Sequence, residues 1–319
     1  MASVNRRRRL SYAQLAKLAA SDAVSYDSFG NSVAIAGGTV VVGAHHDDDD
    51  GSESGSAYVF RTSDGGATYV EVAKLTASDA ASDDRFGVSV AIAGDTVVIG
   101  ATGDDDGGSD SGSAYVFHTT DGGATYGQVA KLTAADGAAY DNFGIPVAIA
   151  GDTVVVGAYF DKIGGGNGHI YYSHGSAYVF RTTDGGATYD QVAKLTAADA
   201  AWGDQFGRSV AIDGATVVVG ARSDDDASGC TDTYCNSGSA YVFRTTDGGA
   251  TYGQVAKLTA ADARSSPFPN PGSIRIGGFE RRLDAIAPAF GGGGGLAEAA
   301  VCTAAVSSDL QTDSDGIRI

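Results

Sequence analysis

Short apolar runs separated by glycine- and aspartate-rich turns recur along most of this chain. Each copy of the pattern contains F-G, V-A-I, T-V-V-[VI]-G-A, a polar loop, S-A-Y-V-F, T-[ST]-D-G-G-A-T-Y and V-A-K-L. The four copies begin at Phe29, Phe86, Phe143 and Phe206, with spacings of 57, 57 and 63 residues. Self-similarity at such a period is typical of solenoids and propellers. The chain is therefore predicted to repeat one structural unit, and specific chemistry is expected where the copies differ.

The pattern predicts four β-strands in each unit. In the first unit they are Val33–Ile35, Thr39–Ala44, Ser56–Phe60 and Tyr69–Leu75. Glycine at the first position of the two-residue turn after V-A-I, such as Gly37, suits a type II′ hairpin. The T-V-V-V-G-A strand is apolar at successive positions, so both of its faces should be buried. The unit is thus an antiparallel four-stranded sheet.

A single sheet of this kind leaves apolar surface exposed, and radial stacking of such sheets gives a β-propeller. The fold class is therefore predicted to be all-β, a β-propeller of four-stranded antiparallel blades. It would be a four-bladed ring, an open arc or part of a larger ring. Residues 13–18 (A-Q-L-A-K-L) match the fourth strand and precede the first unit as an orphan outer strand. Phe29 and its equivalents are expected to wedge between blades.

The residues that define each unit resemble FG-GAP repeats, the blades of integrin α-subunit propellers. The Phe-Gly and Gly-Ala pairs that carry the resemblance are Phe29-Gly30 with Gly43-Ala44, Phe86-Gly87 with Gly100-Ala101, Phe143-Gly144 with Gly157-Ala158, and Phe206-Gly207 with Gly220-Ala221. An aspartate two residues before each Phe, at Asp27, Asp84, Asp141 and Asp204, fits as well. The resemblance implies an extracellular or cell-surface β-propeller that acts in adhesion or protein binding without catalysis.

Two local motifs qualify this resemblance. Calcium-binding FG-GAP members carry a D-x-[DN]-x-D-G-x-x-D loop between the Phe-Gly and Gly-Ala strands, and here that span is only a short turn. Because a two-residue turn cannot supply the six to eight oxygens of calcium, that site is not carried over. No cofactor is predicted from it. The T-x-D-G-G-A-T-Y segments resemble the Asp-box turn of sialidase-type propellers, which implies a propeller fold and not sialidase chemistry.

Composition and charge narrow the classes of partner. The formal net charge is −18, so a nucleic-acid partner is not expected. No apolar run is long enough to span a membrane. Residues 1–11 form a basic arm without the apolar segment of a secretory signal. The repeats occupy 12–260, as units of about 19–75, 76–132, 133–195 and 196–258, and the Gly/Pro-rich residues 261–319 are expected to be a disordered tail or the trace of a truncated propeller.

The acidic loops between the second and third strands are the clearest polar feature, and they should emerge on one rim. Their aspartates are weak candidates for cation ligands: Asp47, Asp48, Asp49, Asp50, Asp104, Asp105, Asp106, Asp224, Asp225 and Asp226. The alternative is a solvated loop that favours solubility. Consecutive carboxylates do not converge easily on one ion, so calcium is an open alternative here and not an assignment.

The third and fourth units differ most from the others. The third-unit loop 159–175 lacks the Asp run, and its candidate partner-binding residues are Lys162, His169, Tyr171, Tyr172 and His174. The fourth-unit loop contains Cys230 and Cys235, a candidate disulfide that favours an oxidising compartment. Trp202 is expected to pack, with a contact on the rim as the alternative. Since specificity concentrates on loops held by a rigid scaffold, the recognition surface is predicted here.

The sequence therefore favours a non-enzymatic binding or adhesion module for a protein or glycan ligand. A propeller glycan hydrolase is the first alternative, but Arg61, Arg181 and Arg244 occupy equivalent positions around the array and are not expected to converge on one substrate. An intracellular propeller scaffold is the second alternative.

Overall fold

The computed structural model describes residues 13–162, 173–225 and 236–260, and within these ranges the chain consists of strands and loops without a helix. Four antiparallel sheets, each of four strands in chain order, follow one another and are called blades 1 to 4. The strands are β1 (Ser32–Ala36), β2 (Thr39–Ala44), β3 (Ser56–Arg61) and β4 (Val70–Leu75) in blade 1; β5 (Phe86–Ala93), β6 (Thr96–Ala101), β7 (Ser113–His118) and β8 (Gly127–Leu132) in blade 2; β9 (Val147–Ala150), β10 (Thr153–Ala158), β11 (Ser176–Arg181) and β12 (Asp190–Leu195) in blade 3; and β13 (Phe206–Asp213), β14 (Thr216–Ala221), β15 (Ser239–Arg244) and β16 (Gly253–Thr259) in blade 4. The predicted all-β fold and its four-stranded unit are confirmed.

The first hairpin of each blade follows from its glycine. In blade 1, Ala36 pairs with Thr39, which leaves Gly37 and Gly38 as a two-residue turn. Gly37 has a φ of 56°, whereas the φ of Gly38 is not positive. A positive φ at the first central residue alone is the signature of a type II′ turn, as the sequence predicts.

The second and third strands of each blade form its core. Val41 and Val42 face opposite sides of the sheet, yet both are buried. In β3, the run from Ser56 to Phe60 is buried throughout. This continuous burial explains why these strands are apolar at successive positions in blades 1 to 3, where both faces of the sheet are covered. In blade 4, β14 and β15 are buried only at alternate positions.

Apolar clusters join consecutive blades. Val41 and Val59 of blade 1 pack with Val97 and Ile99 of blade 2, and the same contact recurs between blades 2 and 3 and between blades 3 and 4. Phe86 is completely buried in the first junction, where its ring meets Tyr115 edge-on at a centroid distance of 5.5 Å. The prediction that the Phe of each Phe-Gly pair wedges between blades is confirmed for the three junctions.

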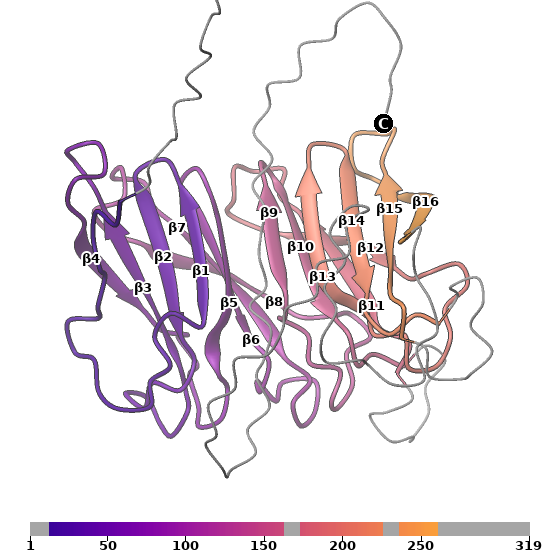
Figure 1. Cartoon of the computed structure of the whole chain (residues 1–319), viewed down its shortest axis with the longest axis horizontal. Helices are drawn as coiled ribbons and strands as arrows, with labels where there is room; N and C mark the ends of the chain where they lie inside the picture. The colour runs from indigo at the N-terminus through magenta and orange to yellow at the C-terminus, as the bar shows by residue number, and fades with distance from the viewer. Residues whose placement is uncertain (1–12, 163–172, 226–235, 261–319) are drawn as a thin grey trace, which may run out of the picture.

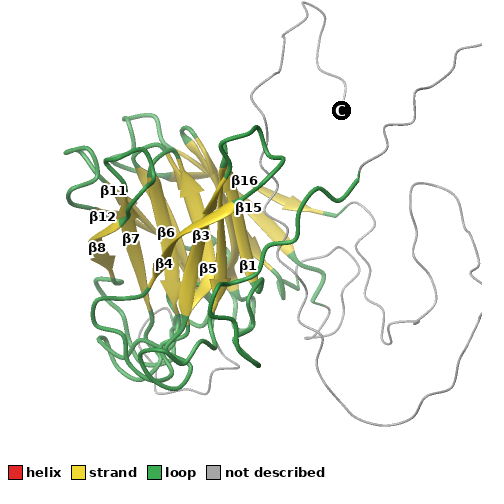
Figure 2. Ribbon diagram, turned by 90° about the vertical axis from the view of Figure 1, so that its left-hand side faces the viewer, coloured by secondary structure: helices red, strands yellow, loops and turns green. Residues whose placement is uncertain are grey.

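The four blades form an arc with blade 1 at one end and blade 4 at the other (Figure 1). Among the described residues, no apolar cluster joins blade 4 to blade 1. Figure 2 looks from the blade 1 end of the arc, where β4 is the outer strand. The face of blade 1 that lacks a preceding blade is instead covered in part by Leu18, Ala20 and Phe29.

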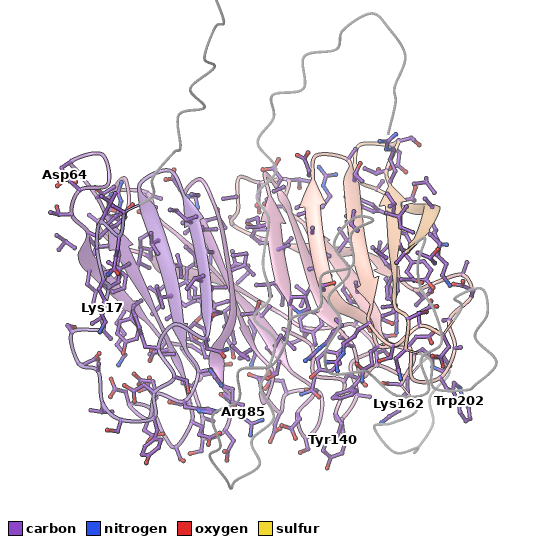
Figure 3. The ribbon with its side chains drawn as sticks, in the orientation of Figure 1. Lys17, Asp64, Arg85, Tyr140, Lys162 and Trp202 are labelled. Carbon is purple, nitrogen blue, oxygen red and sulfur yellow. The ribbon has the colours of Figure 1, made fainter. Side chains whose placement is uncertain are left out.

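The loops gather at two opposite rims. The first-hairpin turns and the D-G-G turns, marked by Asp64 in Figure 3, lie at one edge, which we call the turn rim. The loops between second and third strands and the linkers between blades, marked by Arg85, Tyr140, Lys162 and Trp202, lie at the other edge, which we call the loop rim. No described helix could cross a bilayer.

Candidate functional site

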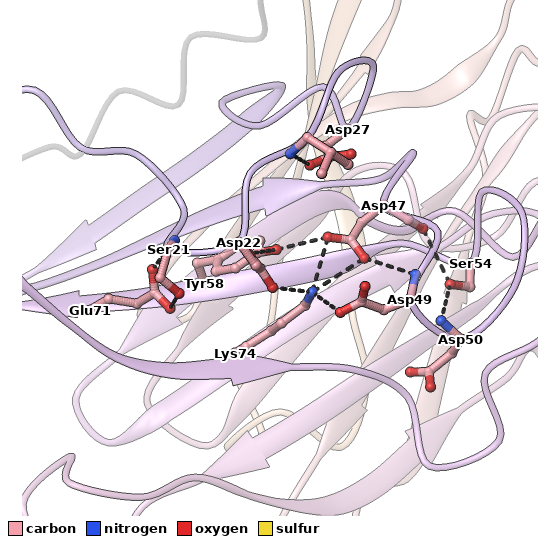
Figure 4. Close-up of polar contacts among 11 residues, drawn as sticks. Ser21, Asp22, Asp27, Asp47, Asp49, Asp50, Ser54, Tyr58, Glu71 and Lys74 are labelled. Carbon is pink, nitrogen blue, oxygen red and sulfur yellow. Dashed lines mark hydrogen bonds and ion pairs between the residues drawn. The ribbon is translucent and has the colours of Figure 1, made fainter.

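A lysine ammonium held among carboxylates is the dominant polar feature of the loop rim. In blade 1, the Lys74 ammonium lies 2.7 Å from Asp22 Oδ2 and 3.1 Å from Asp47 Oδ2, and it also pairs with Asp49 (Figure 4). The Tyr58 hydroxyl lies 2.8 Å from both Asp22 Oδ1 and Asp47 Oδ2. These residues come from β4, the preceding linker, the β2–β3 loop and β3, so the cluster ties four segments of one blade together.

The same cluster, which we call the lysine cage, is present in every blade. The other three lysines and their partners are Lys131 with Asp79, Asp104 and Asp106; Lys194 with Asp136 and Asp161; and Lys257 with Asp199 and Asp224, at distances of 2.6–2.9 Å. The central aspartate is 2–5% exposed in all four. A buried carboxylate needs this compensation, since an unpaired buried charge is strongly unfavourable.

The electrostatics of the cage fix its charged state. Burial alone would lower the pKa of Lys74, but hydrogen bonds from its ammonium to Asp22 and Asp49 outweigh burial and raise that pKa. In blade 2, burial raises the pKa of Asp104, and hydrogen bonds from Lys131 and Tyr115 outweigh it and hold the pKa below its usual value. Lysine and aspartate therefore both stay ionised near neutral pH.

The cage determines what the candidate cation ligands do. Carboxylate oxygens of Asp22, Asp47 and Asp49 lie within 4.8 Å of one another, a spacing that suits a metal ion. The Lys74 ammonium already lies among them and supplies the positive charge. A divalent ion would have to displace a half-buried lysine that already pairs with these carboxylates, so the cluster is arranged as an ion-pair network.

The neighbouring aspartates of the acidic loops have different tasks. Asp48 Oδ1 accepts a hydrogen bond of 2.7 Å from the Glu53 backbone amide, and Asp105 Oδ1 accepts the equivalent bond from Asp110. Asp50 is bonded through its backbone amide to Ser54 Oγ. Each loop is thereby closed by its own side chains. Asp48 and Asp50 therefore serve the loop, whereas Asp47 and Asp49 both pair with the Lys74 ammonium.

Blade 3 shows what the sequence analysis missed. Its loop lacks an Asp run, but Asp161 is buried and pairs with Lys194 as Asp47 does with Lys74. Its position in the repeat indicates this role, because an aspartate lies three residues after the Gly-Ala pair in every unit. The V-A-K-L lysine, present in every copy, is a second indication.

A second conserved carboxylate shapes each linker. Asp84, two residues before Phe86, is buried and accepts a 2.8 Å hydrogen bond from the Ala81 amide. Asp27, Asp141 and Asp204 make the same bond three residues back. Burial raises the pKa of Asp84 to about 6, and it has the same effect on Asp141. These aspartates hold the linker turn.

The structure divides the candidate partner-binding residues. Lys162 is half-buried at the loop rim, and the edge of the His174 ring faces Trp202 at a centroid distance of 6.3 Å. Burial lowers the pKa of His174, so its ring is neutral near pH 7. His169, Tyr171 and Tyr172 lie outside the described residues, as do Asp226 and the candidate disulfide of Cys230 and Cys235.

The linkers carry exposed aromatic side chains. Trp202 is 71% exposed, so the expectation that it packs is wrong. The linker turn places it on the rim, ahead of the buried Asp204 and Phe206. Tyr140 is 47% exposed in the linker between blades 2 and 3, and Tyr26 is 91% exposed ahead of blade 1. The loop rim therefore displays aromatic surface beside its acidic loops.

Two of the recurrent arginines, Arg61 and Arg181, lie on the turn rim and contact the next blade, whereas Arg244 of blade 4 is exposed. Arg61 of blade 1 donates to the Gly122 carbonyl of blade 2, and Arg181 of blade 3 donates to Gly248 of blade 4. In the same turns, Asp121 accepts hydrogen bonds from Thr119 Oγ1 and from both the amide and the hydroxyl of Thr125. These groups connect blades and close turns.

Four stacked antiparallel blades with this motif define a repeat protein of the β-propeller class. The family model of the FG-GAP repeat matches residues 12–60, 69–117, 126–180 and 189–243, which together make up more than half of the chain. The protein belongs to the FG-GAP repeat family.

Comparisons with individual proteins add little to this. No curated protein matches the sequence. Among solved structures, Sqt1 of Saccharomyces cerevisiae is similar with a TM-score of 0.41 and 10% identity, over 74% of this chain and 49% of Sqt1. The chain thus spans about half the length of Sqt1.

Proposed function

We propose that this FG-GAP repeat protein is a non-enzymatic binding module, and that it contacts a protein partner through the loop rim at the junction of blades 3 and 4. The observation that carries the proposal is the exposure of Trp202 on a linker that the buried Asp204 and Phe206 hold in place. Tryptophan and tyrosine are enriched among the residues that dominate binding energy at protein interfaces.

The surroundings of Trp202 support this location. The His174 and Trp202 rings are in contact, and Lys162 adds a cation to a rim rich in aspartate. The neighbouring blade linker adds Tyr140. Blades 1 and 2 carry the regular acidic loops instead, so the rim is uneven, as a selective surface on a repetitive scaffold should be.

The buried contacts favour binding over hydrolysis. Arg61 and Arg181 are used in blade contacts on the turn rim, away from the aromatic residues of the loop rim. The central cage aspartates are paired with lysines and do not face one another as an acid and a base across a substrate site. We place the protein at the cell surface or outside the cell, in line with the resemblance to integrin propellers.

The experiment is a screen of the full-length chain against immobilised extracellular proteins and glycans, followed by titration of any captured partner. Trp202→Ser and Tyr140→Ser should each weaken binding at least about tenfold, as truncation of an interface anchor does. Tyr26→Ser, which removes an even more exposed tyrosine at the far end of the arc, is the matched control and should bind normally. All three variants should unfold at the wild-type temperature. Full affinity in the Trp202 and Tyr140 variants would overturn the assignment, and turnover of a glycoside substrate would overturn the non-enzymatic proposal.

Localisation has its own test. Mass spectrometry after alkylation of the native protein without reductant should leave Cys230 and Cys235 unmodified if they are paired in an oxidising compartment. Alkylation of both would favour the intracellular scaffold.

A further inference from the structure

We propose that two copies of this chain associate head to tail, with blade 1 of one copy docking on the outer face of blade 4 of the other. The contact would repeat the junctions that already join blades 1 to 2, 2 to 3 and 3 to 4. Two features found at all three junctions, and a third found at two of them, have one half on blade 4 and the complementary half on blade 1, with no partner blade between them.

The first feature is the close approach of two glycines. A Cβ added to Gly43 of blade 1 would lie 1.9 Å from the Gly87 carbonyl oxygen of blade 2, and the same contact joins Gly100 to Gly144 and Gly157 to Gly207. Among the described residues, a Cβ on Gly220 of blade 4 would meet no other blade, and one on Gly30 of blade 1 would have no atom within 4 Å. The two ends of the arc thus hold the two halves of a fourth glycine contact.

The second feature is apolar surface. Val41, Val98 and Val155 are completely buried, whereas their blade 4 equivalent Val218 is only half-buried. Leu258 is 53% exposed, although its equivalents Leu75, Leu132 and Leu195 are at most 4% exposed. At the other end, Val33 is 59% exposed, and its equivalent Val90 is buried against blade 1. Apolar residues that are buried at every internal junction are therefore exposed at both ends.

The third feature is a polar contact on the turn rim. Arg61 and Arg181 each donate to the carbonyl of the first glycine in the next blade's D-G-G turn. Arg244 has the equivalent position on blade 4 and is exposed. Gly65 of blade 1 is the corresponding acceptor. A Cβ built on the next residue, Gly66, would meet only Tyr69 of its own blade among the described residues, whereas one on Gly123 would meet Arg61 of the preceding blade. Arg244 of one copy can therefore reach Gly65 of the next.

Docking requires one local rearrangement. At an internal junction, the leucine at the end of one blade's fourth strand packs on the next blade, as Leu75 of blade 1 does on blade 2. On blade 1, Leu18 occupies the equivalent place. In the docked pair, Leu258 of one copy would need the place that Leu18 occupies on the other. Strand β16 is paired with β15, whereas residues 13–18 belong to no strand and Leu15 is 76% exposed. We therefore expect docking to displace Leu18 and to leave β16 paired with β15.

The arrangement determines how the assembly grows. The surfaces in contact differ between the two copies, so the interface is heterologous and extends until a ring closes or a filament forms. Each contact between copies joins the exposed face of blade 1 in one copy, which we call the head, to the exposed face of blade 4 in the other, which we call the tail. Blocking the head of one copy and the tail of another should therefore limit assembly to a dimer.

The test is sedimentation velocity of the full-length chain from low micromolar to submillimolar concentration. Wild type should form species larger than a monomer as concentration rises. Val33→Glu blocks the head and Val218→Glu blocks the tail, so each variant alone should stay monomeric. An equimolar mixture should give a dimer and nothing larger. Arg244→Glu, at an exposed position, is a second tail variant in case Val218→Glu does not fold.

Several outcomes would overturn the proposal: a wild-type monomer throughout, association of Val33→Glu alone, or a mixture that stays monomeric. The displacement of Leu18 has a separate readout. Leu18→Ser removes the competing side chain and should lower the concentration needed for association severalfold, whereas Leu15→Ser, three residues away and exposed, should not change it. Weaker association of Leu18→Ser would show that this segment is part of the interface.

Discussion

Gly100 of blade 2 lies against the carbonyl oxygen of Gly144 of blade 3, so closely that a Cβ on Gly100 would approach that oxygen to 1.8 Å. The first glycine belongs to a Gly-Ala pair and the second to the Phe-Gly pair of the next unit. The two short motifs that define the repeat are thus the two sides of one contact between blades. Phe143, adjacent to Gly144, is buried in the same junction.

The lysine cage predicts a calcium-responsive variant. Lys131→Met should lower the free energy of unfolding by about 3 kcal/mol, because the buried Asp104 loses its partner. The carboxylates of Asp79, Asp104 and Asp106 remain within 4.8 Å of one another, so millimolar Ca²⁺ should raise the melting temperature of the variant. Wild type should show no rise, because the ammonium already lies in that position.

The matched control is Lys17→Met, which makes the same replacement at an exposed lysine. Its effect on stability should stay within about 0.5 kcal/mol, and calcium should not alter it. An equal calcium response in wild type and in Lys131→Met would contradict the role given to the ammonium.

The linker aspartates predict a gain in stability on substitution. The pKa of Asp84 is about 6 in the folded protein, above the value of about 4 expected in the unfolded chain. Ionised Asp84 therefore destabilises the fold above pH 6, and this cost disappears as pH falls below 4. Asp84→Asn keeps an oxygen for the Ala81 amide and should be more stable than wild type at pH 7.5 by about 1–2 kcal/mol. Denaturant titrations at pH 7.5 and pH 4 should show the difference vanish at the lower pH, and a difference independent of pH would refute the assignment.

The D-G-G turns predict the opposite dependence. Hydrogen bonds from Thr125 and Thr119 lower the pKa of Asp121. Its stabilising contribution is thus present above pH 4 and is lost as pH falls below that value. Asp121→Asn should melt below wild type at pH 7, and the two melting temperatures should converge in strong acid. Equal melting temperatures at pH 7 would show that the turn does not depend on the charge.

Backbone strain in the linkers predicts a stabilising glycine. Asp83 has a φ of 71°, and Gly203 occupies the equivalent position before blade 4. Asp83→Gly should raise stability by about 0.5–1 kcal/mol, because glycine adopts a positive φ without steric cost. Asp95→Gly removes the same charge from an exposed turn position without a positive φ, and it should lower stability by a similar amount. Urea titration of both variants measures the contrast, and the same sign for both would contradict the strain argument.

The sequence was sufficient to predict the blade. Val41 and Val42 in succession required a strand buried on both faces, and Gly37 fixed the hairpin turn. These inferences depend on local pattern, which repeats four times and is unambiguous for that reason. The arc was one of several arrangements left open, because closure depends on curvature summed over blades and not on any residue pair.

The rim was less accessible to sequence analysis. Runs of aspartate do not reveal Asp161, because the cage uses a single aspartate at a fixed distance from Gly-Ala. Trp202 was expected to pack because tryptophan is usually buried, but the linker is fixed by Asp204 and Phe206 and leaves the ring outside. Both depend on tertiary contacts between segments that are distant in sequence.

The most direct test of the blade contact is a comparison of Gly100→Ala with Gly220→Ala in equilibrium unfolding at a concentration where the chain is monomeric. The added methyl at position 100 would meet the backbone of blade 3, whereas at position 220 it would meet only the Ser209 side chain, which can rotate away. We predict that Gly100→Ala costs at least about 3 kcal/mol or abolishes cooperative unfolding, and that Gly220→Ala costs no more than about 1 kcal/mol. Equal losses in the two variants would contradict the claim that the paired glycines seat one blade on the next.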